Sequence, residues 1–381
     1  MYNVSLRGCN SYDYQMVYEQ LKNSIEDLGG LSNYFDVGQT ILLKVNLLMK
    51  RKPEEATTTH PIFVKALAAH FVEYGLEVVI GDSPGGPYNK NTLSGIYKVC
   101  GYELLVDKHI RLNDNFDSFT SHCDEALLMK HIETIDVLND VDHVISVSKL
   151  KTHGMTKFTG AVKNMYGTIP GLKKAEYHYT LPSIEDFSNM LVDVCVNANP
   201  ILSFMDGIVG MEGAGPSGGE PRDIGVILAS DSPYHLDVIA CQIIGVNPVS
   251  VPTIKKCIER KIVDYSFDDI KMLAESINDY YIEDYKIPNI AGVGLLKNHV
   301  PKWLDRVVDG IIKPKPVIKK ESCVGCGECA LCCPAKTIHM INGWPKIELE
   351  NCIRCFCCQE LCPVKAIDIK RHPIGKIMMK M

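Results

Sequence analysis

The chain of 381 residues is 46% hydrophobic and 23% charged, and its formal net charge is −6. This balance is typical of a globular protein and excludes a disordered or fibrous chain, and the length predicts roughly two or three domains. The negative charge gives no general reason to expect nucleic acid or an anionic membrane as a partner. No signal-peptide pattern opens the sequence, and no apolar run reaches the roughly 18 residues of a membrane span, so we expect a cytoplasmic protein.

Residues 1–312 alternate short β-branched runs with amphipathic stretches, which predicts a large α/β domain with a mostly parallel sheet, in one piece or as two subdomains. Strands are predicted at 41–45, 77–80, 143–147, 201–205 and 225–229. One helix is expected to start at Pro61, capped by Thr59, and to end at Gly75, and another to cover 232–244. Helical signals also lie at 254–260 and 268–277, and a later Trp303 and Leu304 are harder to place.

Polar residues follow the predicted strands, where ligands of open α/β sheets usually bind. They are Lys44 and Asn46, Asp82 and Ser83, Lys149 with Lys151 and His153, Asp206 and Glu212, and finally Ser230 and Asp231. Any one of them alone is explained equally well as a helix cap or a turn former. Together they predict a shared site.

The segment 148–171 combines lysines and glycines without any acidic residue. A single lysine is usually a solvated surface charge, but Lys149, Lys151, Lys157 and Lys163 directly after a strand favour a site for carboxylate or phosphate. Two histidines, His153 and His178, are candidates for a general acid or base, or for metal ligation. No third metal ligand is identifiable in the pattern.

A glycine-rich loop is expected at 206–221, either mobile or shaped by a ligand, with Asp206 and Glu212 as its acidic members. Its glycines satisfy G-x-G-x-x-G, but Pro216 interrupts the motif and a strand follows it instead of a helix, so a dinucleotide site is rejected. No Walker A motif occurs, and no flavin or nicotinamide fingerprint is found.

The 16 cysteines are unevenly distributed. Six are scattered through the large domain, at Cys9, Cys100, Cys123, Cys195, Cys241 and Cys257, and ten fall between 323 and 362. A secreted disulfide scaffold would be short and would spread its pairs. The dense block instead indicates thiolate ligands for iron-sulfur clusters.

The Lys- and Pro-rich stretch 313–320 is predicted as a linker, 321–372 as the cysteine-rich domain and 373–381 as a tail.

Two runs that begin 29 residues apart both read C-x2-C-x2-C-x3-C-P, an internal repeat. This is the pattern of a small α+β ferredoxin-like domain with two [4Fe-4S] clusters, in which the fourth cysteine of each run ligates the other cluster. One cluster is therefore assigned to Cys323, Cys326, Cys329 and Cys362, and the other to Cys352, Cys355, Cys358 and Cys333. Zinc is the alternative for four ligands but fits eight poorly. Cys332 and Cys357 are not needed as ligands in this assignment. We interpret them as packing residues, and the alternative is that they replace one of the assigned ligands.

Six segments resemble a widespread bacterial and archaeal family that is known as a domain of unknown function and is often fused to a two-cluster ferredoxin. They lie at 44–46, 57–61, 81–86, 148–154, 160–167 and 206–219. The resemblance covers nearly the whole chain and implies candidate site residues, though no activity. These are Lys44, Asn46, His60, Asp82, Lys149, Lys151, His153, Lys163, Asn164, Asp206 and Glu212.

The preferred functional hypothesis is an iron-sulfur oxidoreductase. A redox partner, ferredoxin or a reductase, would supply low-potential electrons through the clusters to a small anionic substrate held by Lys149, Lys151 and Lys163 and protonated by His153 or His178. One alternative is a non-enzymatic electron carrier or cluster donor, and another is a non-redox enzyme with structural or sensory clusters. Homo-oligomerisation is compatible with the sequence, but no pattern argues for it.

Overall fold

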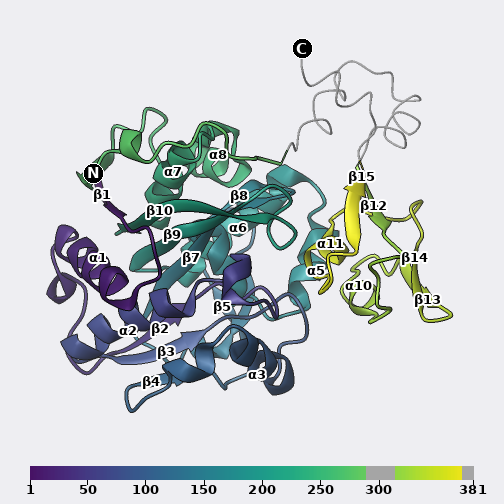
Figure 1. The fold of residues 1–381 in the computed structure, drawn as a ribbon, viewed down its shortest axis with the longest axis horizontal. Helices are drawn as coiled ribbons and strands as arrows, with labels where there is room; N and C mark the ends of the chain where they lie inside the picture. The colour runs from purple at the N-terminus through teal and green to yellow at the C-terminus, as the bar shows by residue number, and fades with distance from the viewer. Residues whose placement is uncertain (289–313, 371–381) are drawn as a thin grey trace.

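The computed structural model describes residues 1–288 and 314–370, which form a large α/β domain and a small cysteine-rich module beside it (Figure 1). Trp303, Leu304, the whole expected tail and the start of the expected linker lie outside the described residues. The fold class predicted from the sequence is confirmed.

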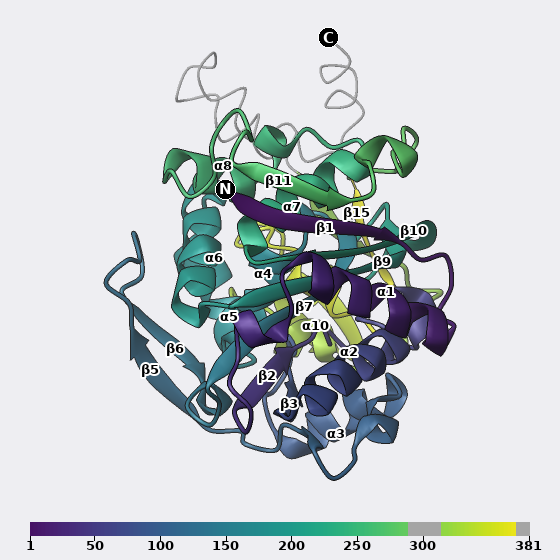
Figure 2. The same ribbon diagram turned by 90° about the vertical axis from the view of Figure 1, so that its left-hand side faces the viewer.

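One nine-stranded sheet runs through the described part of the large domain in the order β11-β1-β10-β9-β7-β2-β3-β4, with β8 added beside β7. Figure 2 shows most of these strands stacked in this order. Five of the strand pairs are parallel, whereas β1 with β10, β10 with β9, and β7 with β8 are antiparallel. The strands are β1 (Tyr2–Gly8), β2 (Thr40–Lys44), β3 (Glu77–Gly81), β4 (Ile110–Leu112), β7 (His143–His153), β8 (Lys157–Thr159), β9 (Leu202–Glu212), β10 (Glu220–Ser230) and β11 (Ile270–Ala274). A separate hairpin pairs β5 (Ser118–His122) with β6 (His131–Ile135).

Helices cover both faces of this sheet, which explains why its strands are apolar on both sides. Ile41 and Leu43 of β2 pack in the same core as α1, α2 and α3, whereas Leu42 packs in another core with α6. A third core joins the second face of β1 and β10 to α7 and α8. The helices are α1 (Tyr14–Asp27), α2 (Pro61–Tyr74), α3 (Lys90–Val99), α4 (Ala161–Asn164), α5 (Lys173–Thr180), α6 (Ile184–Ala198), α7 (Pro233–Ile243) and α8 (Pro252–Glu259).

All five predicted strands occur, but β7, β9 and β10 are several residues longer than predicted, and β10 runs in an unexpected direction. Because β10 is antiparallel to β9, Ser230 lies opposite Ser203 at the start of β9. The prediction that Ser230 and Asp231 join the shared site is therefore wrong, and Asp231 instead accepts hydrogen bonds from Asn3.

Three further predictions are corrected. The helical signal at 268–277 is wrong, because 270–274 forms the strand β11, whose Ile270 and Met272 pack against one core while Leu273 packs against another. The glycine-rich loop is shorter than expected, since β9 continues to Glu212 and β10 begins at Glu220. Finally, α2 is capped by the side chain of His60, not by Thr59.

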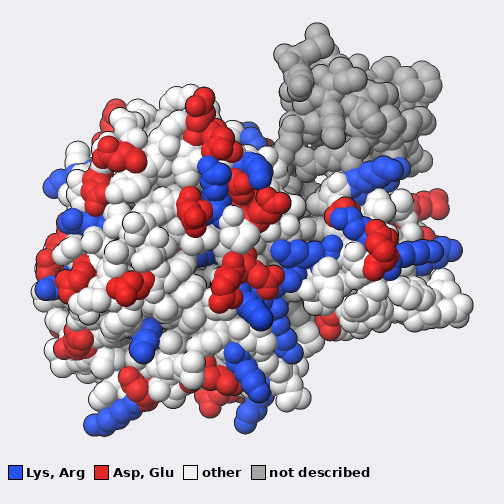
Figure 3. Space-filling model, in the orientation of Figure 1, with Lys and Arg blue, Asp and Glu red and all other residues white. Residues whose placement is uncertain are grey.

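The described part of the small module consists of two two-stranded antiparallel sheets and two one-turn helices. Its elements are β12 (Lys315–Ile318), α10 (Glu328–Leu331), β13 (Ile338–Ile341), β14 (Trp344–Ile347), α11 (Cys357–Glu360) and β15 (Ile367–Lys370). The described part of the expected linker is extended, but it pairs with β15 and so belongs to the module's sheet. Acidic and basic side chains are mixed over the face drawn in Figure 3.

Candidate functional site

A cavity of about 90 Å³ lies where the large domain meets helix α11 of the module. Its walls come from the carboxyl end of β2, the loop after β3, the segment 151–178 and α11. Four lysines and two carboxylates line it, so the lining carries an excess of positive charge when the lysines are protonated. The lining residues with polar side chains are Lys44, Asn46, Asp82, Ser83, Lys151, Thr159, Lys163, Asn164, Tyr166, Lys174, His178, Cys357 and Glu360.

Lys44, Asp82 and Asn164 form a buried network that fixes the floor of this cavity. The Lys44 ammonium lies 2.8 Å from Asp82 Oδ1 and donates to Asn164 Oδ1 at 3.1 Å and to the Val45 carbonyl at 2.7 Å. Burial lowers the pKa of Lys44, and Asp82 opposes this shift. Because its ammonium makes two hydrogen bonds and an ion pair within the protein, Lys44 shapes the site more than it binds a ligand.

Lys151 is buried and makes two hydrogen bonds. Its ammonium donates to Asn46 Oδ1 and to the Thr57 carbonyl, both at 2.6 Å, and within the described part of the chain its third hydrogen has no acceptor and can serve a ligand. Burial lowers its pKa to about 7, and the charge of Lys163 adds to the shift. A lysine that titrates near neutral pH is suited to act as a general acid.

Lys163 and His178 bring unused polar groups to the same cavity. Among the described residues, none forms a hydrogen bond or ion pair with the Lys163 ammonium, which lies 5.7 Å from the centre of the Tyr166 ring. His178 is 7% exposed, and its Nδ1 atom has no hydrogen-bond partner among the described residues. Burial and the nearby Lys163 charge lower its pKa to about 3, so the ring is neutral at physiological pH.

The remaining wall comes from the module, through Cys357, Glu360 and Leu361. Leu361 packs at Gly85, where a Cβ atom would lie only 2.8 Å from its nearest methyl carbon. Other contacts hold the module in place: Arg51 donates to the Cys362 carbonyl at 3.2 Å and Ser217 to the Glu360 carbonyl at 2.5 Å. The cavity is therefore completed only by the module.

His153 lies behind this wall and is not among the lining residues. Its Nδ1 atom accepts from the amides of Met155 and Thr156, which places the ring proton on Nε2, 3.3 Å from Glu360 Oε1. Burial lowers the pKa of His153 well below its usual value and raises that of Glu360. His153 is therefore neutral, its Nε2 atom forms no hydrogen bond with any of the described residues, and the ring lies outside the cavity lining.

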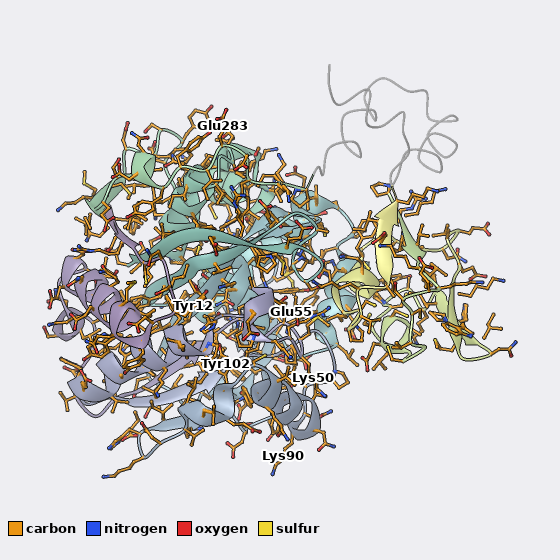
Figure 4. The ribbon with its side chains drawn as sticks, in the orientation of Figure 1. Tyr12, Lys50, Glu55, Lys90, Tyr102 and Glu283 are labelled. Carbon is orange, nitrogen blue, oxygen red and sulfur yellow. The ribbon has the colours of Figure 1, made fainter. Side chains whose placement is uncertain are left out.

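Three predicted site residues form a different cluster, together with Tyr12. Asp206 accepts from Tyr12 at 2.8 Å, from the Lys149 ammonium at 2.8 Å and from the His60 amide at 3.0 Å. The rings of Tyr12 and His60 stack with their centres 3.6 Å apart. Figure 4 shows Tyr12 away from the module, whereas Glu55 lies on the side that faces it. All acceptor sites of Asp206 are used, so this cluster ties β7, β9 and α2 together.

Glu212, predicted as a catalytic residue, also lies apart from the cavity. Its carboxylate pairs with the Lys286 ammonium at 3.0 Å and accepts from the Lys286 amide at 3.1 Å. Of the residues predicted for the site, the cavity brings together Lys44, Asn46, Asp82, Lys151, Lys163, Asn164 and His178.

Sequence reasoning did not select Lys174, Tyr166, Cys357 or Glu360. Lys174 donates to the carbonyls of Ser83 and Pro84 and so closes the loop after β3 onto α5. Glu360 and Cys357 lay within a cysteine run, where only the ligand pattern attracted attention. Their spacing is the signal that could have identified them. Residues three apart share one face of a helix, and this face points away from the cluster ligands.

The module's eight predicted ligands fall around two small cavities. One is lined by Cys323, Cys326, Cys329 and Cys362, and the other by Cys333, Cys352, Cys355 and Cys358. Each set includes the crossing cysteine expected from the repeat. In addition, the Thr337 amide donates to Cys333 Sγ at 3.3 Å and the Ala366 amide to Cys362 Sγ at 3.2 Å. Cysteine-lined cavities with amide donors to sulfur fit iron-sulfur clusters.

These features define the class of protein: an iron-sulfur protein whose cluster module completes a cationic cavity on an α/β domain. Residues 315–363 match the 4Fe-4S dicluster domain. Residues 41–242 match the domain of unknown function DUF362. Since this match covers more than half of the chain, the protein belongs to the DUF362 family, and the resemblance drawn from the sequence motifs is confirmed.

One curated relative is the thylakoid-associated protein sll1697 of Synechocystis sp., 29% identical over 294 residues, which cover 76% of this chain and 88% of that protein. Two solved structures are similar in part. The lactate racemase apoprotein from Thermoanaerobacterium thermosaccharolyticum has a TM-score of 0.39 and 12% identity over 61% of this chain and 55% of its own. A protein from Thermotoga maritima has a TM-score of 0.34 and 14% identity over 58% and 56%. This chain thus spans a little over half the length of these two structures.

No helix of the described residues is long and apolar enough to cross a membrane.

Proposed function

We propose that this protein is a cytoplasmic oxidoreductase that reduces a small anion in the cavity between the α/β domain and the module, with electrons from two [4Fe-4S] clusters. The observation that carries the proposal is the composition of the cavity wall, in which strand-end lysines face a helix of the cluster module. Cys357 lines the cavity and is directly followed by Cys358, a predicted cluster ligand. A cluster ligated by Cys358 would therefore lie beside the cavity that holds the substrate.

The substrate is proposed to be small and to carry one or two negative charges. The cavity volume of about 90 Å³ is far below the several hundred Å³ of a drug-sized pocket. The lining combines four lysines with two carboxylates, which favours an anion over a neutral ligand or a cation. A small carboxylate, a dicarboxylate or a phosphate group fits this description.

Lys163 and Lys151 have different proposed roles. Lys163 binds the anion directly, because its ammonium has no hydrogen bond or ion pair to residues 1–288 or 314–370; the Nδ1 of His178, which lacks a partner in the same ranges, lines the cavity as well. Lys151 has one ammonium hydrogen that no described residue accepts, and burial lowers its pKa to about 7, so it is the proposed proton donor when the substrate is reduced. Lys149 and His153, which the sequence included, are not needed. A redox partner protein supplies the electrons, and each cluster passes them on one at a time.

The first test is an anaerobic reconstitution of the full chain, followed by iron and sulfide analysis and by calorimetric titration with inorganic phosphate and with succinate. We expect about eight irons and binding of one of the two anions. Reduced viologen should then drive turnover of a member of the anion class that binds.

The matched variants are Lys163→Met and Lys157→Met, since both lysines belong to the same cationic segment but only Lys163 lines the cavity. Lys163→Met should lower anion affinity at least tenfold, and Lys157→Met should leave it unchanged. Equal effects of both variants would contradict the proposed site. Eight irons without any anion binding would favour an electron carrier instead, and turnover that is insensitive to cluster oxidation state would favour a non-redox enzyme.

A further inference from the structure

His178 of α5 is held in the cavity by ring contacts alone. Its imidazole stacks on Phe187 of α6 with the ring centres 4.2 Å apart, and Tyr166 approaches it edge-on at 6.4 Å. The side chain is 7% exposed, and within residues 1–288 and 314–370 neither ring nitrogen forms a hydrogen bond. Leaving a buried polar nitrogen without a partner costs free energy, so such a side chain in a cavity lining indicates a ligand.

The ring is neutral, which limits what it can offer to that ligand. Burial lowers the pKa of His178 to about 3, and the charge of Lys163 adds to the shift. A neutral imidazole has one N–H donor and one acceptor nitrogen and adds no charge to the cavity. Because the lysines already serve the charge of an anion, the separate task left for His178 is a hydrogen bond to an uncharged oxygen. A neutral imidazole N–H can polarise a carbonyl group in this way.

The proposed chemistry narrows the substrate in the same direction. An anion that is reduced in the cavity must contain a group that accepts electrons. Neither inorganic phosphate nor a saturated carboxylate has such a group, whereas a carbonyl carbon accepts electrons. The cavity volume of about 90 Å³ favours a molecule in which the carbonyl group is next to the charged group. A carboxylate for Lys163 and an adjacent carbonyl oxygen for His178 meet both conditions.

We propose that the substrate is a small 2-oxo carboxylate and that His178 is a catalytic residue that donates a hydrogen bond to its carbonyl oxygen. The inference rests on the proposed function for the reduction itself and for the source of the electrons. Lys163 binds the carboxylate, and Lys151 is the proton donor, since its third ammonium hydrogen has no acceptor among the described residues. The product is the corresponding 2-hydroxy carboxylate.

The reaction balances with two electrons and two protons. The carbonyl double bond becomes a single bond, the oxygen gains a proton from the Lys151 ammonium, and the carbon gains a proton from water. The electrons come from a low-potential electron-carrier protein, which gives up one electron in each of two encounters, and Lys151 is reprotonated from water. His178 keeps its hydrogen throughout. Its hydrogen bond stabilises the negative charge that develops on the carbonyl oxygen when the first electron arrives.

The test uses the reconstituted full chain in its oxidised state, without a reductant, so that ligands bind but do not react. Calorimetric titration compares pyruvate with propionate, which has the same carbon chain and carboxylate but no carbonyl oxygen. Infrared spectroscopy of bound pyruvate, labelled with carbon-13 at its carbonyl carbon, measures the carbonyl stretching frequency, which falls when a hydrogen bond polarises the group. Iron content and melting temperature are measured for each variant.

The variants are His178→Phe, which keeps a ring to stack on Phe187 but has no ring nitrogen, and His178→Asn, which keeps an N–H donor. The matched control is His70→Phe. His70 is also stacked on a tyrosine, with its ring centre 3.9 Å from that of Tyr18, and it is 8% exposed, but it does not line the cavity. A general effect of replacing a buried histidine would therefore appear in the control as well.

The wild type should bind pyruvate about tenfold more tightly than propionate, the effect of one hydrogen bond to a buried group. His178→Phe should lose this preference while its affinity for propionate stays unchanged, and its bound pyruvate should show a higher carbonyl frequency than in the wild type. His178→Asn should retain part of the preference, and His70→Phe should behave as wild type.

Three results overturn the inference: equal affinities for pyruvate and propionate in the wild type, a preference and a carbonyl frequency that are the same in wild type and His178→Phe, or equal losses in His178→Phe and His70→Phe. If phosphate or propionate binds in a Lys163-dependent manner but pyruvate has no advantage, the proposed anion site stands and this inference falls. If pyruvate binds through His178 but reduced viologen does not convert it to lactate, the proposed reduction falls, while the contact between His178 and a 2-oxo carboxylate stands.

Discussion

A substitution in the ion pair between Lys149 and Asp206 can show whether these two residues have a structural or a catalytic role. The sequence predicted both as site residues, but the structure places them in the cluster with Tyr12, outside the cavity lining. Lys149 Nζ lies 2.8 Å from Asp206 Oδ2, and the side chains are 1% and 0% exposed. Replacing Asp206 by Asn leaves the buried ammonium without a counter-charge.

The expected loss of stability is large. Removing one partner of a buried ion pair usually costs about 3–5 kcal/mol, because the other charge stays buried. Asp206 also accepts from the Tyr12 hydroxyl and the His60 amide, and an Asn side chain keeps only one carbonyl oxygen for these donors. We therefore expect Asp206→Asn to lose about 3–5 kcal/mol in free energy of unfolding, with cavity chemistry unchanged in the protein that remains folded.

Urea denaturation followed by circular dichroism measures this change, with anion binding measured on the same samples. Lys255→Met is the control, since Lys255 pairs with Glu185 and Glu259 on the surface and should contribute at most about 1 kcal/mol. An Asp206→Asn variant within about 1 kcal/mol of wild type that has lost turnover but still binds the anion would refute the reasoning and restore the catalytic role.

Three further predictions concern the cavity and the module. Anion affinity should be highest at about pH 6 and below and fall as the pH rises through about 7, because Lys151 and Lys174 lose their charge around their lowered pKa values, and calorimetry between about pH 5 and pH 9 would expose a flat profile. Gly85→Val should overlap Leu361, weaken anion binding and raise hydrogen exchange in α11, whereas Gly86→Ala, with open space around its Cβ position, should not. Anaerobic iron chelation should abolish amide protection over 315–370 but spare the large sheet, and protection that survives would show that the module folds without metal.

The fold could be predicted from the sequence wherever burial on both faces makes strands uniformly apolar. This is why the cores of β2, β3, β7 and β9 were found at the right places. The direction of β10 was missed, although a signal existed. Parallel neighbours need a crossover of a dozen or more residues, but only 213–219 separate β9 from β10, too few for a helix. A hairpin was the physically required connection.

The candidate site was only partly predictable, because a strand-end rule cannot separate neighbouring residues on one strand. Lys149 and Lys151 are two residues apart on β7 and looked equivalent in the sequence. In the structure the register with β9 shifts between them, so Lys149 pairs with Asp206 while Lys151 reaches Asn46. Such a shift depends on the partner strand and leaves no mark in the lysine spacing.

The residues that the module contributes to the site could not be predicted from the sequence. They lie in one copy of a repeat whose two copies differ outside the ligand cysteines. In the alignment of the two cysteine runs, Glu328 and Leu331 stand where Cys357 and Glu360 stand in the second run. Both Glu328 and Leu331 are exposed on α10, Leu331 at 55%, whereas the second pair is enclosed against the α/β domain. The ligand spacing is the same in both runs, so it cannot show which half docks. The docked half differs in having a cysteine and a carboxylate on the helix face that turns away from the clusters. Their place at the cavity can be recognised only in the structure, where the lysines of the α/β domain lie beside them.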